Sequence, residues 1–202
     1  MNDKIAIDVV LLPSVETADW VIGLNRRLLE TTADKIVLNR IDCVPHISLA
    51  MGCIERKDIG AISEILEDIA GKLNKGELKF TNINIETNSA GQKISGLLIE
   101  KTEQLQLLHE TVLEKLSPYF SYDVSEEMVL AGKVNSTTLS WIRNYRHQSS
   151  FENFSPHVTI GYGEIEGCGF LSVFNVASLG LFHLGNHCTC RKILFATRAI
   201  CR

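Results

Sequence analysis

A short motif occurs twice in the sequence, and each copy carries a histidine followed two residues later by a hydroxyl residue. The copies are residues 45–52 (Pro-His-Ile-Ser-Leu-Ala-Met-Gly) and residues 156–163 (Pro-His-Val-Thr-Ile-Gly-Tyr-Gly). Histidine has the side-chain pKa nearest neutrality, so two histidines can supply a general base and a general acid. The candidate site therefore consists of His46, Ser48, His157 and Thr159.

Each copy has the composition of a β-strand, in which successive side chains point to opposite faces. In the first copy this alternation predicts one face with His46, Ser48 and Ala50, and a packing face with Ile47, Leu49 and Met51. In the second copy it predicts one face with His157, Thr159, Gly161 and Gly163, and a packing face with Val158, Ile160 and Tyr162. A histidine and a hydroxyl on one face stand about 7 Å apart at the backbone, so both can contact one phosphate group.

Cleavage of a phosphodiester suits this pair of histidines. One histidine takes a proton from the attacking water or hydroxyl, and the other protonates the departing oxygen. The serine and threonine hydroxyls, together with a protonated histidine, can stabilise charge on the phosphate oxygens. None of these steps requires a metal, and we expect neither a metal nor a cofactor.

The paired sequences His-x-Ser-Leu and His-x-Thr-Ile resemble the signatures of the 2H phosphoesterase superfamily, which includes the 2′-5′ RNA ligase and cyclic nucleotide phosphodiesterase family. The resemblance implies an α+β fold that is bilobal and pseudo-twofold, with two mainly antiparallel sheets flanked by helices around a central cleft. It also implies that residues 1–202 form a single bilobal domain with one motif in each lobe.

The same resemblance implies an activity and assigns roles by position. The activity is metal-independent hydrolysis of a 2′,3′-cyclic phosphate or a 2′,5′-phosphodiester of a nucleotide or RNA end, with RNA ligation as a further activity of such proteins. His46 and His157 are the implied catalytic pair, in an order that the sequence leaves open. Ser48 and Thr159 are the implied phosphate contacts.

Two other interpretations remain open. His46 and His157 can be buried histidines whose ring nitrogens are satisfied by backbone carbonyls. Alternatively, the cleft can belong to a nucleotide-binding module without turnover, or the chain can be a protein-interaction scaffold. The intact motif pair favours an enzyme.

Apolar periodicity and capping residues predict the elements around the motifs. Strands are expected at residues 4–12, 42–53, 77–86, 93–100, 128–134, 178–184 and 190–199 and from Pro156 onward, and helices at residues 14–30, 56–74, 102–116 and 136–147. This mixed order predicts an α+β protein. Residues 118–154 read as an insertion between the motifs that shapes substrate choice.

Other histidines and cysteines form a second candidate cluster. His183, His187, Cys188 and Cys190 are residue types that bind zinc, but they lie on one expected hairpin without the paired Cys-x2-4-Cys spacing, so hairpin residues are the favoured interpretation. His109 and His147 are expected at helix surfaces.

Aromatic and basic residues near the motifs are weaker candidates. Phe154 and Tyr162 can stack on a base, although the strand alternation favours core packing for Tyr162. Arg40 and Lys93 can supply positive charge to a phosphate, although isolated basic residues are usually solvated.

Composition limits the ligand and the compartment. The 202 residues are 45% hydrophobic and carry a net charge of −4, which argues against a long duplex nucleic acid and leaves a small nucleotide or RNA terminus as partner. The N-terminus lacks a signal-peptide pattern and no apolar run is long enough to span a membrane, so we expect a cytoplasmic protein with its six cysteines reduced. The oligomeric state is not indicated.

Overall fold

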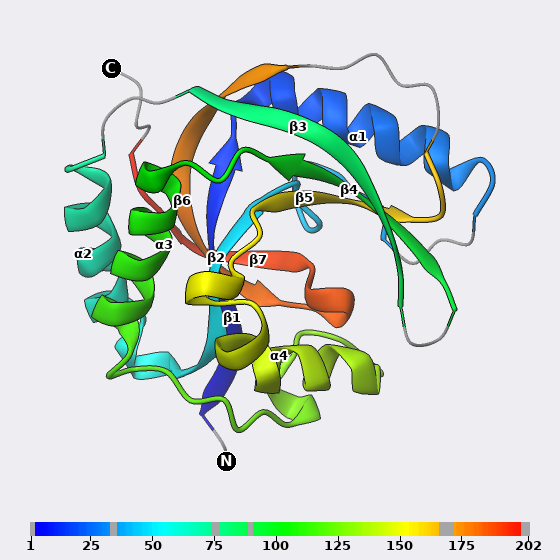
Figure 1. The fold of residues 1–202 in the computed structure, drawn as a ribbon. Helices are drawn as coiled ribbons and strands as arrows, with labels where there is room; N and C mark the ends of the chain where they lie inside the picture. Colours follow the sequence, from blue (N-terminus) through cyan, green and yellow to red (C-terminus); the bar gives the residue numbers. More distant parts are fainter. Residues whose placement is uncertain (1–2, 33–35, 74–76, 89–90, 166–171, 199–202) are drawn as a thin grey trace.

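Seven strands and four α-helices make up the residues that the computed structural model describes, which are 3–32, 36–73, 77–88, 91–165 and 172–198 (Figure 1). The strands are β1 (Lys4–Pro13), β2 (Ile47–Glu55), β3 (Glu77–Thr87), β4 (Lys93–Ile99), β5 (His157–Tyr162), β6 (Val173–Leu184) and β7 (Cys190–Ala196). The helices are α1 (Val15–Leu29), α2 (Ile59–Ala70), α3 (Glu103–Leu116) and α4 (Ser136–Gln148). The predicted α+β class is confirmed.

All strand pairs are antiparallel and belong to one seven-stranded sheet, in the order β2-β1-β6-β3-β4-β5 with β7 also on β6. The expected pair of sheets is therefore continuous through β6. The first residues of β6 pair with β3 over Glu77–Lys79, and its later residues pair with β7. Strands β3 and β7 therefore pair with different parts of β6. The sheet has two groups of strands, one that contains β2 and one that contains β5.

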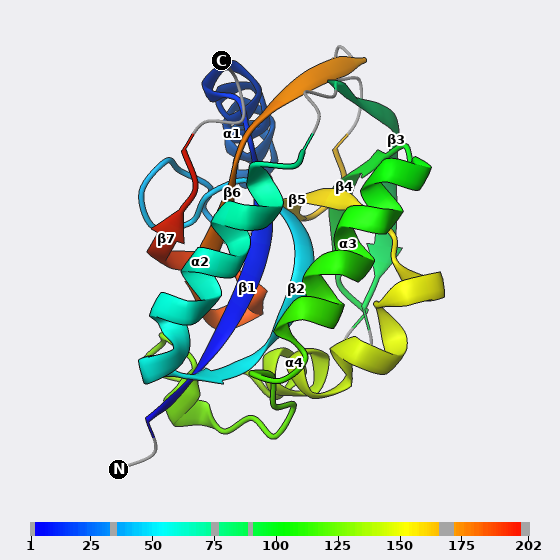
Figure 2. The same cartoon turned by 90° about the vertical axis from the view of Figure 1, so that its left-hand side faces the viewer.

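The helices cover the strands from several sides. Helices α2 and α3 lie together beside β1 and β2, whereas α1 lies at the far side, against β5 (Figures 1 and 2). Helix α4, within the expected insertion, packs against β2. Each motif strand is thus supported by a helix from a distant part of the chain.

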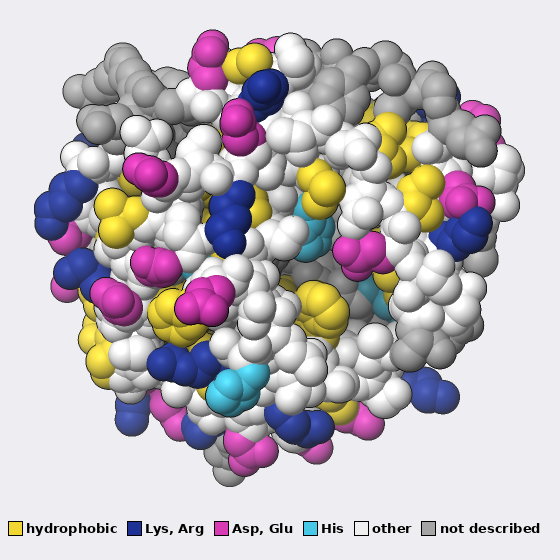
Figure 3. All heavy atoms as spheres, viewed as in Figure 1, with side chains coloured by type: hydrophobic (Ala, Val, Ile, Leu, Met, Phe, Trp, Pro, Cys, Tyr) yellow, Lys and Arg dark blue, Asp and Glu magenta, His cyan; other side chains and the backbone are white. Residues whose placement is uncertain are grey.

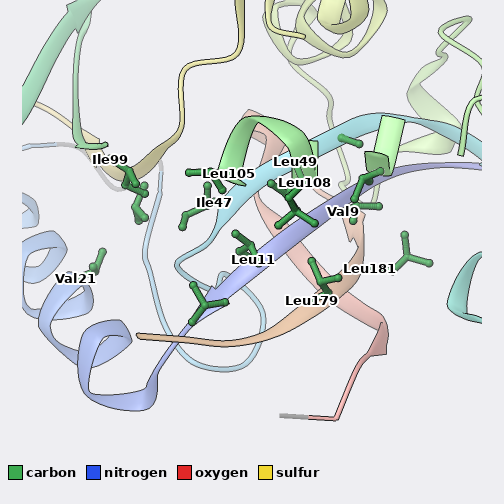
Figure 4. Packing of buried hydrophobic residues seen from close by; sticks show 14 of the residues in the cluster. Val9, Leu11, Val21, Ile47, Leu49, Ile99, Leu105, Leu108, Leu179 and Leu181 are labelled. Carbon is green, nitrogen blue, oxygen red and sulfur yellow. The ribbon is translucent and has the colours of Figure 1, made fainter. Parts of the chain in front are cut away.

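The main core fills the space between the sheet and these helices (Figure 4). Ile47 and Leu49 of β2 point toward Leu105 and Leu108 of α3. Removing such side chains from water contributes about 1.5–3 kcal/mol each. This burial fixes β2, and with it the residues on its opposite face.

Local chemistry explains where the elements begin and where the predictions are wrong. Ser14 and Thr102 cap α1 and α3 as expected, because each side chain accepts a hydrogen bond from a first-turn N–H. Strand β2 begins at Ile47 rather than at residue 42, because Asn39 Oδ1 accepts hydrogen bonds from the backbone N–H groups of the two residues before Cys43 and holds a turn. No strand forms at residues 128–134, where the chain makes a 3-10 turn (Glu126–Met128) and an irregular segment.

Both motif strands contain a β-bulge at the same position of the repeat. In β2, Ala50 pairs with Val9 but Ser48 pairs with Val10, so Leu49 is the extra residue. In β5, Gly161 pairs with Ser95 but Thr159 pairs with Gly96, which makes Ile160 the extra residue. A bulge reverses the alternation of the side chains that follow it.

The carbonyl oxygen of each bulged residue accepts a hydrogen bond from a buried side chain of a helix. Asn25 of α1 donates to Ile160 O at 2.7 Å and also binds the backbone of Ile36 and Leu38. His109 of α3 donates from Nδ1 to Leu49 O at 2.7 Å and accepts at Nε2 from Phe151 N at 2.8 Å. Neither Asn25 nor His109 is accessible to solvent. His109 was expected at a helix surface, and that expectation is wrong.

We expect Asn25→Ala and His109→Ala each to lower the free energy of unfolding by about 2–4 kcal/mol, because each leaves buried backbone groups without partners. Chemical denaturation monitored by circular dichroism measures this. The exposed neighbours Arg26→Ala and Gln104→Ala are the controls. Equal effects in the buried and exposed positions would contradict the role assigned to the two side chains.

Candidate active site

A cavity of about 600 Å³ lies between the two motif strands, and it contains all four candidate residues. His46 and Ser48 line it from the β2 side, and His157 and Thr159 line it from β5. Figure 3 shows this face of the molecule hollowed near its centre, with histidine side chains visible inside the hollow. The structure therefore brings together the residues that the repeat singled out.

The two histidines are held in the same way. His46 Nδ1 lies 2.7 Å from Val44 O, and His157 Nδ1 lies 2.8 Å from Ser155 O. Because a carbonyl oxygen only accepts, each Nδ1 carries the proton, and in the neutral ring Nε2 has the free lone pair. Backbone carbonyls therefore satisfy Nδ1 of each ring, as the interpretation of buried histidines expected, but they do not satisfy Nε2. Nε2 remains available for proton transfer.

The environments of the two histidines differ. His46 is largely enclosed, with 15% of its side chain exposed, whereas His157 is exposed to the cavity. Burial, which disfavours the charged ring, lowers the pKa of His46 to about 4, with a smaller contribution in the same direction from His157. His46 is therefore neutral at pH 7, and the two rings are close enough to interact.

Ser48 has a partner that sequence reasoning missed. Its Oγ and Asp8 Oδ2 share a hydrogen bond of 2.6 Å, and His46 Nε2 lies 3.8 Å from the same oxygen. Asp8 is inaccessible to solvent, and burial raises its pKa well above the usual value of 3.8. The available signal was an acidic residue in the otherwise apolar run of β1.

The bulges change which residues face the cavity. Met51 and Tyr162, predicted on the packing face, line the cavity. Ala50 joins the main core, and Gly161 lies against α1, where an added Cβ would come within 3.0 Å of Asn25 Nδ2. The prediction fails at these positions because strict alternation ends at the bulge.

The remaining walls come from α4 and from β3. Helix α4 contributes Trp141, which is 45% exposed, and Tyr145, which is buried. That residues 118–154 are an insertion that shapes substrate choice stays a prediction. An exposed aromatic residue on a helix gave no distinctive sequence signal for Trp141.

Among the described residues lining the cavity there is no lysine or arginine. Arg40 forms an ion pair with Asp19, and Lys93 forms one with Glu164, so the suggestion that Arg40 and Lys93 neutralise a phosphate is wrong for this arrangement. Glu86 is the carboxylate among the lining residues. Among the described lining residues, the histidines are therefore the side chains that can carry a positive charge.

Phe154 does not stand free to stack on a base. It is 4% exposed, and its ring lies parallel to that of His109 with centroids 3.9 Å apart. Both Phe154 and Tyr162 line the cavity, and Tyr162 hydrogen-bonds to His187 Nδ1 at 3.0 Å. Tyr162 is the more exposed of the two aromatic candidates.

The predicted cluster on the last hairpin is not a metal group in the described part of the chain. His183 binds Met128 O, whereas His187 binds Tyr162. The donor atoms that do gather within 4.8 Å of one another belong to Asp8, His46 and Cys190. These oxygen, nitrogen and sulfur atoms are of donor types that zinc accepts.

The four described cysteines, Cys43, Cys53, Cys188 and Cys190, are free thiols, and Cys168 and Cys201 lie outside the described residues. No described helix combines the length and apolar character needed to cross a bilayer.

Comparison with solved structures identifies the fold. No family model and no curated protein matches the sequence. The structure of Escherichia coli LigT complexed with phosphate aligns with 97% of this chain and 99% of its own, at 11% identity and a TM-score of 0.51. A crystal structure of a phosphoesterase (12% identity, TM-score 0.49, 95% and 97% covered) and LigT complexed with 3′-AMP (12%, 0.46, 96% and 99%) also align.

The fold assignment rests on the structure of LigT complexed with phosphate. At 11% identity this similarity shows the fold alone. The chain is an antiparallel α+β protein with a central cavity. Its fold is that of E. coli LigT, in agreement with the architecture implied by the motif pair.

We expect Asp8→Asn to stabilise the protein increasingly as the pH rises. Above pH 3.8 the unfolded wild-type chain loses the Asp8 proton while the folded chain keeps it, so wild-type stability falls by up to about 1.4 kcal/mol per pH unit. Denaturation of both proteins between pH 4 and pH 8 measures the difference. Asp123→Asn, at an exposed carboxyl, is the control, and a stability difference for Asp8→Asn that does not change with pH would contradict the prediction.

Proposed function

We propose that this protein is a 2H-type phosphoesterase that hydrolyses a 2′,3′-cyclic phosphate or a 2′,5′-phosphodiester of a nucleotide or RNA end, without a metal. In this proposal residues 1–202 act as one bilobal domain, with one motif in each lobe. The single observation that supports it best is that two histidine–hydroxyl pairs, from strands far apart in the sequence, line one cavity. The LigT fold, seen in complex with phosphate, supports it independently.

His46 is the proposed general base. Its Nε2 has a free lone pair at neutral pH, and it takes the proton from the attacking water as the oxygen bonds to phosphorus. His157, in its protonated form, then donates its Nε2 proton to the oxygen that leaves phosphorus. The products are a phosphate monoester and a free hydroxyl; His46 then releases its proton to solvent and His157 regains one from solvent.

Ser48 and Thr159 are the proposed contacts for the non-bridging phosphate oxygens. Each hydroxyl lies on the same strand face as its histidine, so one phosphate group can meet both walls of the cavity. These contacts hold the phosphorus between the base and the acid, as in-line displacement requires.

The charge of the cavity favours a diester over a monoester. A phosphodiester carries one negative charge, which a single protonated histidine can balance, whereas a monoester carries nearly two at neutral pH. No described lining residue is a lysine or arginine that could balance the second charge. The proposed ligand is therefore a small diester or an RNA terminus rather than a long duplex, whose binding needs clustered basic residues.

His46→Ala and His157→Ala should each reduce kcat/KM on a 2′,3′-cyclic nucleotide by about 10²–10⁴-fold, because each removes a proton-transfer group. Product formation followed by chromatography, together with circular dichroism as a folding check, measures this. His147→Ala, at an exposed position outside the cavity, is the control. Wild-type rates in both variants would refute the proposal, and nucleotide binding without any product would favour a binding module.

The acidic limb of kcat/KM should lie near pH 4, because the base must be unprotonated and burial lowers the pKa of His46 to about 4. Activity should fall about tenfold for each pH unit below that value. Initial rates on the cyclic nucleotide, with reversibility checked by return to pH 7, measure the limb. A limb near the ordinary histidine value of 6.5 would show that His46 is not the base.

A further inference from the structure

We propose that Asp8 is a positioning acid, which in its protonated form turns the Ser48 hydroxyl toward the substrate phosphate. This inference rests on the proposed function, because it concerns how one of the two phosphate contacts becomes a hydrogen-bond donor. It also makes the two halves of the site chemically different.

The contacts of Asp8 point to this role. Oδ2 lies 2.6 Å from Ser48 Oγ, and Oδ1 is buried without a hydrogen-bond partner among the described residues. No described lysine or arginine forms an ion pair with the carboxyl group. A buried carboxyl with one hydrogen-bond partner does little to stabilise the fold, because one hydrogen bond offsets only part of its desolvation cost.

The repeat shows what an ordinary residue at this place would be. In the ladder of β1 with β2, Asp8 pairs with Met51, two residues before the Val10–Ser48 pair. In the matching ladder of β4 with β5, Ile94 pairs with Tyr162, two residues before the Gly96–Thr159 pair. Asp8 and Ile94 are thus equivalent positions. The second half of the site is built with an aliphatic residue where the first half buries an acid.

The protonation state of Asp8 decides what Ser48 offers to a ligand. When Asp8 is ionised, the Ser48 proton is held by the carboxylate, and only lone pairs of Oγ face the cavity. When Asp8 is protonated, its O–H donates to Ser48 Oγ, and the serine proton is free to donate to a phosphate oxygen.

The surroundings of Asp8 hold it in the neutral form. The groups that face it are His46, just before β2, Tyr145 from α4, Cys188 from the turn before β7, and Cys190 from β7. His46 is neutral at pH 7, and thiols and phenols do not become cations, so none of these groups carries a positive charge that would favour the carboxylate. Burial accordingly raises the pKa of Asp8.

The test compares kcat/KM of wild type and Asp8→Asn on a 2′,3′-cyclic nucleotide from pH 5 to pH 9. Asparagine cannot ionise, and its amide can donate to Ser48 Oγ. The ratio of Asp8→Asn to wild type should rise by up to tenfold per pH unit above the Asp8 transition, and taking the ratio removes pH effects that are common to both proteins. In a Ser48→Ala background, Asp8→Asn should change kcat/KM less than twofold at any pH. Asp123→Asn in the otherwise wild-type protein is the control.

A binding measurement separates this inference from the proposed function. Titration calorimetry with 3′-AMP at each pH should show the same rise in relative affinity for Asp8→Asn, whether or not any substrate is turned over. Should Asp8→Asn not fold, Ser48→Ala alone decides, because it must remove the same pH-dependent part of the wild-type affinity. Infrared difference spectra of wild type against Asp8→Asn should show a protonated carboxyl that is replaced by carboxylate bands over the same pH range.

Three outcomes would overturn the inference. A flat ratio in both rate and affinity means that Asp8 does not control Ser48. Carboxylate bands throughout the pH range mean that Asp8 never holds the proton. The third outcome is a metal-dependent activity: a chelator abolishes the activity, Zn²⁺ restores it in the wild type, and Zn²⁺ does not restore it in Cys190→Ser. That result would make Asp8 a metal ligand with His46 and Cys190. Loss of turnover in wild type with an intact affinity ratio would instead reject the proposed function alone.

Discussion

The binding of two bulge carbonyls by buried side chains is the constraint on which the rest of the site depends. A bulge leaves a carbonyl that the strand ladder does not satisfy, and in a buried setting that group needs another partner. Asn25 and His109 supply it, and each also binds the backbone of a second segment. Because α1 supports β5 and α3 supports β2, each motif is held by a helix from elsewhere in the chain. The geometry of either histidine therefore depends on the packing of the whole molecule.

Much of this arrangement could be predicted from the sequence, because it follows from local rules. Apolar periodicity located the four helices of the described residues, caps located the starts of α1 and α3, and the repeat located four of the residues that line the cavity. What escaped prediction depends on contacts distant in sequence. The bulges that exchange Met51 for Ala50 are set by pairing with β1, and the burial of His109 is set by the Leu49 carbonyl. Asp8 was visible as an acid in an apolar strand, but its partner Ser48 lies forty residues away.

Burial, rather than ion pairing, sets the charges in this site. Asp8 Oδ2 and His46 Nε2 lie 3.8 Å apart, a distance at which an exposed acid and base would form an ion pair. Here desolvation raises the pKa of Asp8 and lowers that of His46, so burial favours the neutral form of both. The described lining residues include Glu86 but no lysine or arginine. Ligand recognition then rests on hydrogen-bond direction and on the protonation of a few groups.

The difference between Asp8 and Ile94 has a consequence for how a ligand is oriented. A cavity with two equivalent halves would accept an asymmetric molecule either way round, and a cyclic phosphate opened in both orientations would yield two isomeric monoesters. With an acid behind Ser48 and an isoleucine in the matching place behind Thr159, the halves offer unequal hydrogen bonding to the same molecule. A single buried carboxyl thereby gives an internally repeated fold a direction, and with it a basis for regioselectivity.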